Sequence, residues 1–205
     1  MRLTKPFILQ LIFLLSSFQA IYAFDWELAK NKNGVIVHTR EVENSALKEF
    51  RGKVIIQSTV EDALELIKAP SSYTAWLHDC KSAELLKSNS KEEWFVYLRN
   101  GAPWPVNDRD VIFKSNLTKD SKGEVIIRFK ESTALSKPIP DGVVRIPKMK
   151  GLWKVTPLED GKIQVIYQAH TDPGGSIPEF AANMAVVDIP YNTLLNLKNK
   201  LGSKK

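Results

Sequence analysis

The residues able to carry chemistry in this sequence are few and scattered. There are three histidines, His38, His78 and His170, and a single cysteine, Cys80. None of the histidines lies at metal-ligand spacing from another histidine or from the cysteine. A Cys80–His pair would suit nucleophilic catalysis, but no local signature supports it. The sequence therefore predicts neither a metal centre nor a cofactor.

Other catalytic motifs are missing as well. Gly175-Ser176 lacks the glycine–serine–glycine spacing of a nucleophile elbow. No glycine-rich loop of the kind that cradles phosphates occurs. Cys80 has no partner for an intrachain disulfide, and a lone cysteine is most often a small buried hydrophobic residue. These features favour a protein without catalytic activity.

Arg109 is the charged residue whose position points most to a function. It shares strand parity with Val111 and Phe113, so it is expected to project toward an apolar interior near the start of a strand. A buried guanidinium needs a partner, and a ligand headgroup would supply one. The alternatives, which are slightly favoured, are an ion pair with Glu131 or Asp172, or solvent at the end of the strand.

Residues 1–23 have the layout of a secretory signal peptide. Arg2 and Lys5 form a basic start, the apolar run 7–18 follows, and a stretch of small residues ends at Ala23. The run is short for a membrane span, although an uncleaved anchor is the alternative. We therefore expect cleavage near Ala23 and export to the periplasm or the medium, which leaves residues 24–205.

The composition fits one domain. Of the 205 residues 43% are hydrophobic and 25% are charged, as in ordinary globular proteins. Without residues 1–23 there are 27 basic and 23 acidic residues, a mild and scattered excess of +4. No basic groove with stacked aromatic residues is indicated, which argues against nucleic-acid binding. We expect a monomer with at most transient contact to an anionic membrane surface.

The elements that must position these residues are mostly strands. A short helix is expected near residues 25–30, and a second helix begins after Ser58 or Thr59 and ends at Pro70. Gly123 and Asp160-Gly161 mark tight turns, which favour an antiparallel sheet. Alternating or continuous apolar patterns predict strands at 35–40, 49–56, 94–99, 111–117, 125–130, 143–146, 152–157 and 163–171.

One long helix closes the chain, at about Pro178–Leu201. Apolar residues recur there at three- and four-residue steps, so one stripe of this helix is apolar. Pro190 lies inside it, where proline leaves the carbonyl of Val186 without a partner and favours a kink. The predicted fold class is α+β, with an amphipathic helix laid on an antiparallel sheet.

Several short motifs occur in a suggestive order along residues 24–201. They are Tyr73 with Trp76, Pro103-Trp104-Pro105-Val106, Arg109-Asp110, Val144-Arg145, Gly151 with Trp153, and Asp172-Pro173-Gly174-Gly175-Ser176-Ile177-Pro178 followed by Asn183. Each motif is weak alone, but together with the closing helix they are fairly specific. In this order the chain resembles the START (steroidogenic acute regulatory protein-related lipid transfer) domain family.

The resemblance implies a helix-grip fold, in which a curved antiparallel sheet wraps around a long C-terminal helix. It further implies an internal tunnel for one sterol, phospholipid or similar molecule, with the helix and nearby loops opening as a lid. Sterol-binding members carry a buried acid–base pair on adjacent central strands, whereas Val96 and Ser115 occupy the corresponding positions here. The leading hypothesis is therefore a non-catalytic binder or shuttle of a single lipid whose class is left open.

The inward-facing residues of the central strands and of the helix are candidates for the tunnel wall. For any one of them, an ordinary place in the hydrophobic core is at least as well supported. The candidates are Trp94, Val96, Leu98, Trp104, Arg109, Val111, Phe113, Ile127, Phe129, Tyr167, Phe180, Met184, Val187 and Tyr191.

Two other functions remain open. Related helix-grip proteins include cyclases and dehydratases that act on polyketides, and such an enzyme would need a polar group deep inside. Tyr97, Arg109, Tyr167 and His170 are the candidates for that group. The second possibility is an interaction module that keeps the fold but fills its tunnel with side chains.

Overall fold

The computed structural model describes residues 25–45 and 47–203, without the side chains of residues 179, 180 and 183. The predicted signal peptide therefore lies outside the described residues. Within them, no helix is both long enough and apolar enough to cross a membrane.

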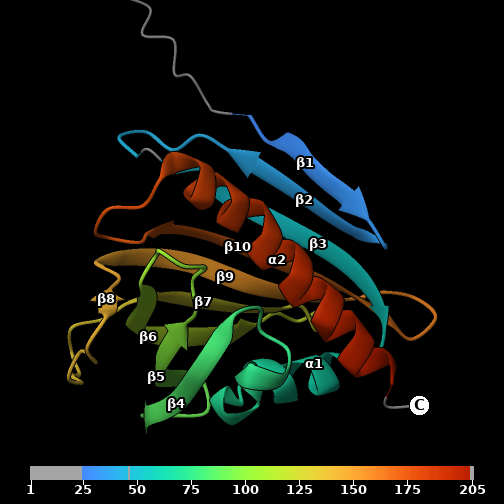
Figure 1. Cartoon of the computed structure of the whole chain (residues 1–205). Helices are drawn as coiled ribbons and strands as arrows, with labels where there is room; N and C mark the ends of the chain where they lie inside the picture. Colours follow the sequence, from blue (N-terminus) through green and yellow to red (C-terminus); the bar gives the residue numbers. More distant parts are fainter. Residues whose placement is uncertain (1–24, 46, 204–205) are drawn as a thin grey trace, which may run out of the picture.

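The described part of the chain forms one ten-stranded sheet with the order β1-β2-β3-β10-β9-β7-β6-β5-β4, with β8 paired to β6 (Figure 1). Every pairing is antiparallel except that of β8 with β6, so the predicted antiparallel sheet is confirmed. The bounds are β1 Glu27–Lys32, β2 Val35–Arg40, β3 Glu49–Gln57, β4 Cys80–Ser88, β5 Glu93–Asn100, β6 Asp108–Lys119, β7 Val125–Glu131, β8 Val143–Arg145, β9 Lys148–Pro157 and β10 Lys162–Asp172.

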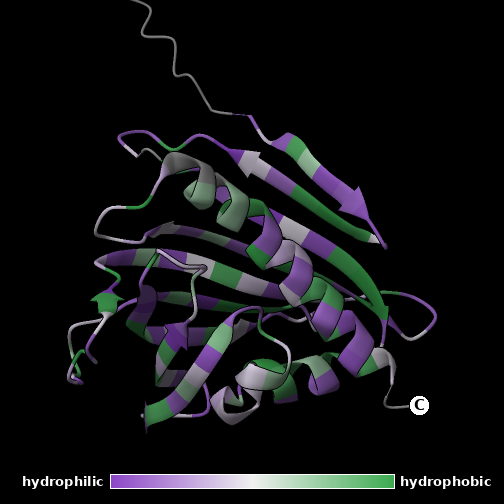
Figure 2. Ribbon diagram, in the orientation of Figure 1, coloured by the Kyte–Doolittle hydropathy of each residue, from purple (hydrophilic) through white to green (hydrophobic). Residues whose placement is uncertain are grey.

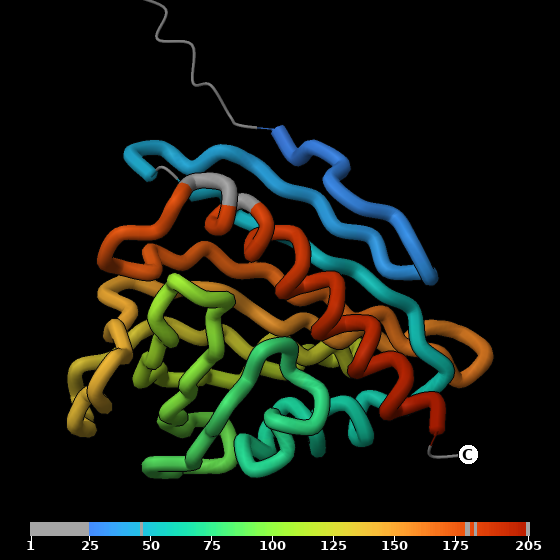
Figure 3. Tube along the Cα trace, in the orientation of Figure 1, coloured from blue at the N-terminus to red at the C-terminus, as the bar shows by residue number. Residues whose placement is uncertain are grey.

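Three helical segments accompany the sheet: α1 (Val60–Ile67), the 3₁₀ helix η1 (Pro70–Ala75) and α2 (Glu179–Gly202). Thr59 caps α1, and its hydroxyl accepts a hydrogen bond from the backbone amide of Asp62 at 3.1 Å. The helix α2 runs diagonally across the concave side of the sheet, and the strands curve around it (Figures 1 and 3). The helix-grip arrangement is thus confirmed.

Gly52 on β3 allows α2 to approach the sheet closely. A Cβ atom at this position would lie 2.6 Å from Cδ1 of Leu194 and 3.3 Å from Cβ of Pro190. Both distances are shorter than ordinary carbon–carbon contacts. A side chain at this position would therefore force Leu194 or the helix to shift where α2 crosses the strand.

Pro190 divides α2 into two unequally packed parts. After it, Leu194 and Leu197 are fully buried and Leu201 is nearly so. Before it, the described side chains are mostly half-buried, and Met184 is 59% exposed. The C-terminal part of α2 therefore anchors the helix to the core, while its N-terminal part has fewer buried contacts to hold it in place.

Hydrophobic and hydrophilic residues alternate along the strands, as the striped colouring in Figure 2 shows. Successive side chains of a strand point to opposite faces of the sheet. On β5 and the first half of β6 both faces are buried, as Val96 on the inner face and Tyr97 on the outer face show for β5. The outer face is covered by the segment that includes Lys137, whose ammonium lies 4.6 Å from the centre of the Tyr97 ring. Both faces of β5 are therefore covered, in keeping with the continuous apolar run of its sequence.

Two edge elements differ from the predictions. Residues 27–32 form the edge strand β1 and not a helix; β1 joins β2 through the Asn33-Gly34 turn, in which both residues have positive φ. The edge strand β4 was not predicted; none of its residues is fully buried, and its register shifts twice against β5. Both strands lie at sheet edges, where exposed side chains blur the alternation on which strand prediction depends.

Candidate functional site: the interior between the sheet and the helix

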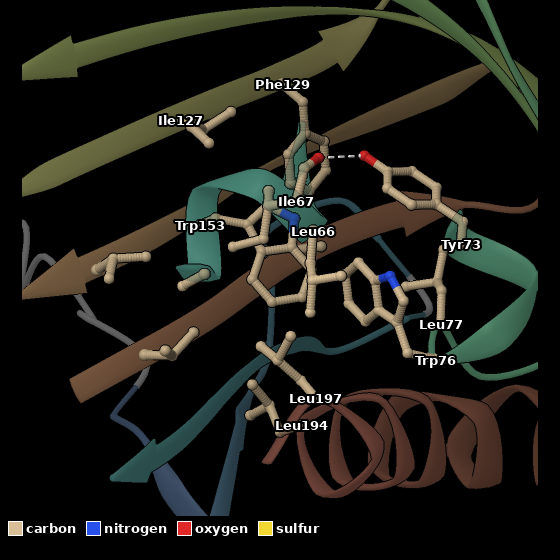
Figure 4. Close-up of a cluster of buried hydrophobic side chains, with 14 of the residues drawn as sticks. Leu66, Ile67, Tyr73, Trp76, Leu77, Ile127, Phe129, Trp153, Leu194 and Leu197 are labelled. Carbon is tan, nitrogen blue, oxygen red and sulfur yellow. Dashed lines mark hydrogen bonds between the residues drawn. The ribbon is translucent and has the colours of Figure 1, made fainter. Parts of the chain in front are cut away.

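The interior of the fold encloses a small apolar cavity. Its volume is about 40 Å³, and its wall comes from the sheet, α1, η1 and the turn after η1 (Figure 4). One water molecule needs about 10–15 Å³, so the cavity holds only a few waters. The lining residues are Ile67, Tyr73, Trp76, Leu77, Trp94, Leu98, Phe113, Ser115, Ile127, Phe129, Met149 and Trp153.

Aromatic rings fill most of the space around this cavity. Trp153 stacks on Tyr167 with ring centres 4.0 Å apart and nearly parallel planes. Trp76 meets Trp153 edge to face at 5.8 Å, and Tyr73 meets Trp76 in the same way at 5.4 Å. Such ring pairs stabilise the fold beyond the area that they bury. The packed rings explain why so little free volume remains in the interior.

The polar groups of this interior are few. The Tyr73 hydroxyl donates to the carbonyl of Ile67 at 2.6 Å, and burial raises the pKa of Tyr73 well above its ordinary value. The indole nitrogen of Trp94 is buried with no hydrogen-bond partner in the described part of the chain, and Trp94 lies opposite Ser115 in the β5–β6 register. An unpartnered donor in a cavity wall is a point where a ligand atom or a water can bind.

Five predicted wall residues line the cavity: Trp94, Leu98, Phe113, Ile127 and Phe129. The other seven cavity residues were not predicted as wall residues: Ile67, Tyr73, Trp76, Leu77, Ser115, Met149 and Trp153. Tyr73, Trp76 and Trp153 belong to the motifs quoted above, so these three could have been found from the sequence.

Other predicted wall residues lie beside the cavity. Val96 and Val111 are buried in the core, and Tyr167 lies behind Trp153. Val187 is half-buried in α2, whereas the side chain of Phe180 lies outside the described structure.

Three predicted wall residues occupy different surroundings. Trp104 is 93% exposed in the loop 101–107, and Met184 is 59% exposed on α2, so neither lines the closed interior. Trp104 is exposed despite its large apolar ring because it lies in a surface loop. Met184 is exposed because it faces outward on the helix. Tyr191 is buried against the β1–β2 hairpin, where Asn33 donates to its hydroxyl at 2.9 Å and Lys30 lies over its ring.

Arg109 lies on the inner face, and neither predicted carboxylate pairs with it. Its guanidinium donates to the backbone carbonyls of Asn107 and Gly174. The two acids serve elsewhere: Glu131 accepts from the amide of Met149 at 2.8 Å, and Asp172 accepts from the amide of Gly174 at 3.1 Å. Burial lowers the pKa of Arg109, which is only 7% exposed. The expected ion pair or solvent contact is therefore wrong.

The residues proposed for an enzyme do not converge. Tyr97 points to the outer face and donates to Asp110 at 3.1 Å, and His170 on that face lies 3.0 Å from the Ser45 hydroxyl. Tyr167 and Arg109 are on the inner face. In residues 25–45 and 47–203, no group of three or more histidine, cysteine or acidic side chains forms a metal site.

A second hollow, of about 490 Å³, lies on the outer face of the sheet. It is open and lined largely by polar side chains, including Lys114, Lys130 and Lys150, which are neighbours in the register of β6, β7 and β9. This hollow is a charged surface, so the interior cavity is the better candidate site for an apolar ligand.

Comparison with known proteins agrees with the fold described above. The START domain family model matches residues 23–188. The chain belongs to the START domain family. A STAR-related lipid transfer protein from Xanthomonas axonopodis superimposes with a TM-score of 0.79 at 38% identity, over 86% of this chain and 98% of that one.

Two further similar proteins are informative. Human StAR-related lipid transfer protein 5 has a TM-score of 0.79 at 18% identity, over 87% of this chain and 86% of that one, which is a likeness of fold. The uncharacterized Pseudomonas aeruginosa protein PA1579 is 38% identical over 177 residues, 86% of this chain and 87% of its own. The predicted family and fold are thus confirmed, and START membership supports lipid binding in general.

Proposed function

We propose that this START domain binds a single lipid molecule between the sheet and α2 and carries it between membranes outside the cytoplasm. The observation that carries the proposal is the apolar interior of the START fold, whose wall is built from tryptophan, phenylalanine and aliphatic side chains. Burial of a lipid chain there gains about 0.8 kcal/mol for each methylene group, so few polar contacts are needed.

Lipid binding requires this interior to expand. Pockets that enclose small organic ligands have volumes of about 300–1,000 Å³, well above the 40 Å³ of this cavity. The part of α2 before Pro190 is only partly buried, whereas the part after it is fixed in the core. Movement of that first part, together with the loop 173–178 before it, is the opening that the packing favours.

Native mass spectrometry tests the proposal directly. The mature chain, residues 24–205, is purified from its exported compartment without detergent. A bound species of lipid mass at close to one per protein supports the carrier function and identifies the ligand class. A protein that is empty and takes up no fluorescent lipid contradicts it.

The small cavity favours a second candidate, a START-fold interaction module with a filled interior. Stacked rings such as those of Trp153 and Tyr167 fill much of the space between the sheet and the helical segments. The two candidates differ in their response to lipid. Hydrogen exchange at residues 179–190 should slow when lipid is added to a carrier, and should be unchanged in a module with a filled interior.

Export is the part of the proposal that rests on residues 1–23. Their basic start, apolar run and small residues before position 24 suit a cleaved signal peptide. N-terminal sequencing of the protein from fractionated cells tests this: a periplasmic or secreted chain that begins near Phe24 supports export, and a cytoplasmic chain that begins at Met1 contradicts it.

A further inference from the structure

Arg109 is a buried cation to which the described chain supplies no counter-charge. The residue is 7% exposed, and no carboxylate among residues 25–45 and 47–203 makes an ion pair with it. Its guanidinium has two backbone carbonyl partners, and its Nε has none. A guanidinium keeps its charge even when burial lowers its pKa, and an unpaired buried charge is costly.

The acids on either side of Arg109 in the sequence show that counter-charges are available nearby but directed away. Asp108 accepts from Lys81 and Arg99 on the outer face. Asp110, which is fully buried, accepts from Arg145 at 2.6 Å and 3.0 Å. Strand alternation sends both carboxylates outward and the guanidinium inward. The absence of a partner is therefore specific to the inner face.

Asn100 provides a second unpartnered polar group at the same place. It lies directly opposite Arg109 in the antiparallel β5–β6 register, so the two side chains leave the same face of the sheet as close neighbours. The Asn100 Oδ1 atom is buried and has no hydrogen-bond partner in the described structure. By rotation of its amide, Asn100 can direct its NH₂ group to a bound anion.

Beyond Asn100 and Arg109, the inward-facing residues of β5 and β6 run toward the cavity and partly line it. Leu98 and Val111 follow, then Val96 and Phe113, and Trp94 and Ser115 come last. From Arg109 to Ser115 the strand rises by about 20 Å, which matches the length of a long acyl chain. A polar end, an apolar strip and the cavity wall therefore lie in line on two adjacent strands.

The loop 173–178 closes over this polar end. The Gly174 carbonyl accepts from Arg109, and a Cβ at Gly175 would lie 3.9 Å from the same guanidinium. Both glycines have positive φ, 63° and 62°, which residues with side chains rarely adopt in succession. If the loop lifts, the guanidinium loses a carbonyl partner and becomes free to receive a ligand.

We propose that Arg109 and Asn100 form the headgroup site for an anionic lipid, with its carboxylate or phosphate on the guanidinium and its chain along β5 and β6. The site deepens the proposed lipid-binding function and rests on it. Charge-assisted hydrogen bonds from arginine to oxyanions are strong and are frequently bidentate.

The test compares two probes that differ only in the headgroup. The affinities of hexadecanoic acid and hexadecanol are measured for the mature wild-type chain and for Asn100→Asp. Inorganic phosphate is measured in the same way, as an anion without an acyl chain. Asn100→Asp places a carboxylate opposite Arg109 and keeps the size of the side chain. The matched control is Asn116→Asp, on the outer face of β6.

We expect the wild type to bind the acid at least tenfold more tightly than the alcohol, and phosphate weakly. Asn100→Asp should lose at least tenfold in affinity for the acid, keep its affinity for the alcohol, and unfold at the same or a higher temperature. Asn116→Asp should behave as the wild type. Arg109→Gln should repeat the loss for the acid, provided that it folds.

Equal binding of acid and alcohol by the wild type, or an unchanged preference in Asn100→Asp, overturns the anionic site while lipid binding stands. Phosphate binding as tight as that of the acid also overturns it, because the site then recognises a free anion. Failure of both chain-bearing probes to bind the wild type removes the proposed function and the headgroup site with it.

Discussion

At the scale of single residues, Asp108 shows how a charge on the outer face supports the interior. It is 8% exposed and accepts from Lys81 at 3.0 Å and 3.1 Å, from Arg99 at 2.7 Å and 3.0 Å, and from the amide of Ala102 at 3.3 Å. It thereby ties the strand before loop 101–107 to the strand after it. Burial acts to raise its pKa, but the hydrogen bonds from Lys81 and Arg99 outweigh burial and lower it.

Asp108→Asn should therefore destabilise the protein by about 1–3 kcal/mol at pH 7, because a bonded charge is lost and two cations lose their partner. The lowered pKa sets the sign of the pH dependence. The stabilisation is present above the ordinary value of 3.8 and is lost as the pH falls toward the folded-state pKa. Urea unfolding at pH 7 and below pH 3 measures this. A difference between wild type and variant that persists in acid contradicts the assignment.

Cys80 provides a second prediction at this scale. Burial raises the pKa of its thiol from 9.0 to about 11. At pH 8 about a hundredfold less thiolate is then present than in the unfolded chain, and the thiolate is the reactive form. Alkylation by iodoacetamide at pH 8 should be slower by about that factor in the native protein than in urea. Equal rates would show that Cys80 is not held in this half-buried site.

Arg109 marks the limit of prediction at the residue scale. Strand alternation was sufficient to place it on the inner face beside Val111. Its partners were not predictable, because Gly174 lies 65 residues away and the loop that carries it is positioned by the whole sheet. Strand alternation therefore predicts the sheet face on which a side chain lies, whereas the position of the loops determines its hydrogen-bond partners.

At the scale of elements, the contact of α2 with β3 depends on Gly52. Gly52→Ala places a methyl group 2.6 Å from Leu194, so the helix must shift or the core must strain. The expected cost is about 1–3 kcal/mol. Gly202→Ala is the matched control, since nothing lies within 4 Å of its added atom. Thermal unfolding of both variants measures the difference, and equal stabilities would contradict the close approach.

Pro190 supports a second prediction for α2. Pro190→Ala restores the amide that can bond to the carbonyl of Val186 and stiffens the helix where its packing changes. If the first part of α2 is the lid, the variant should exchange ligand more slowly at nearly the same equilibrium affinity. Stopped-flow measurement of lipid release tests this. An unchanged release rate would remove Pro190 as the hinge.

Most elements were predictable because their residues have one buried face. β2, β3 and β10 alternate cleanly, and α2 was found to within about one residue at each end. The edge strands were missed because little of β1 or β4 is buried, although Asn33-Gly34 was a hairpin signal. Burial thus determines which elements a sequence reveals.

At the scale of the whole molecule, the sequence was sufficient for the architecture but not for the size of the interior. Five predicted residues line the cavity. Its volume of 40 Å³ results from ring packing among Trp76, Trp153 and Tyr167, which lie 77 and 14 residues apart along the chain. Hydrophobicity predicts that such residues are buried, whereas rotamers and close packing decide whether space remains between them.

Trp104 connects the whole molecule to its proposed work at a membrane. Its side chain is 93% exposed in loop 101–107. Arg109 links this loop to the loop before α2, because it donates to the carbonyls of Asn107 and Gly174. An exposed indole favours the interface between water and lipid, so it would direct the opening end of the fold toward a bilayer. Since Trp104 packs against little, its removal should leave stability almost unchanged.

Trp104→Ala should therefore slow lipid transfer between vesicles several-fold, while the equilibrium affinity for lipid and the unfolding temperature stay as in the wild type. Leu85→Ala is the control, because Leu85 is a 49% exposed apolar residue on the edge strand β4. Fluorescence-based transfer between donor and acceptor vesicles separates the two sites. A slower Trp104→Ala with a normal Leu85→Ala places the membrane contact on the loop. Equal slowing in both variants would mean that general surface hydrophobicity, and not the loop, brings the protein to the bilayer.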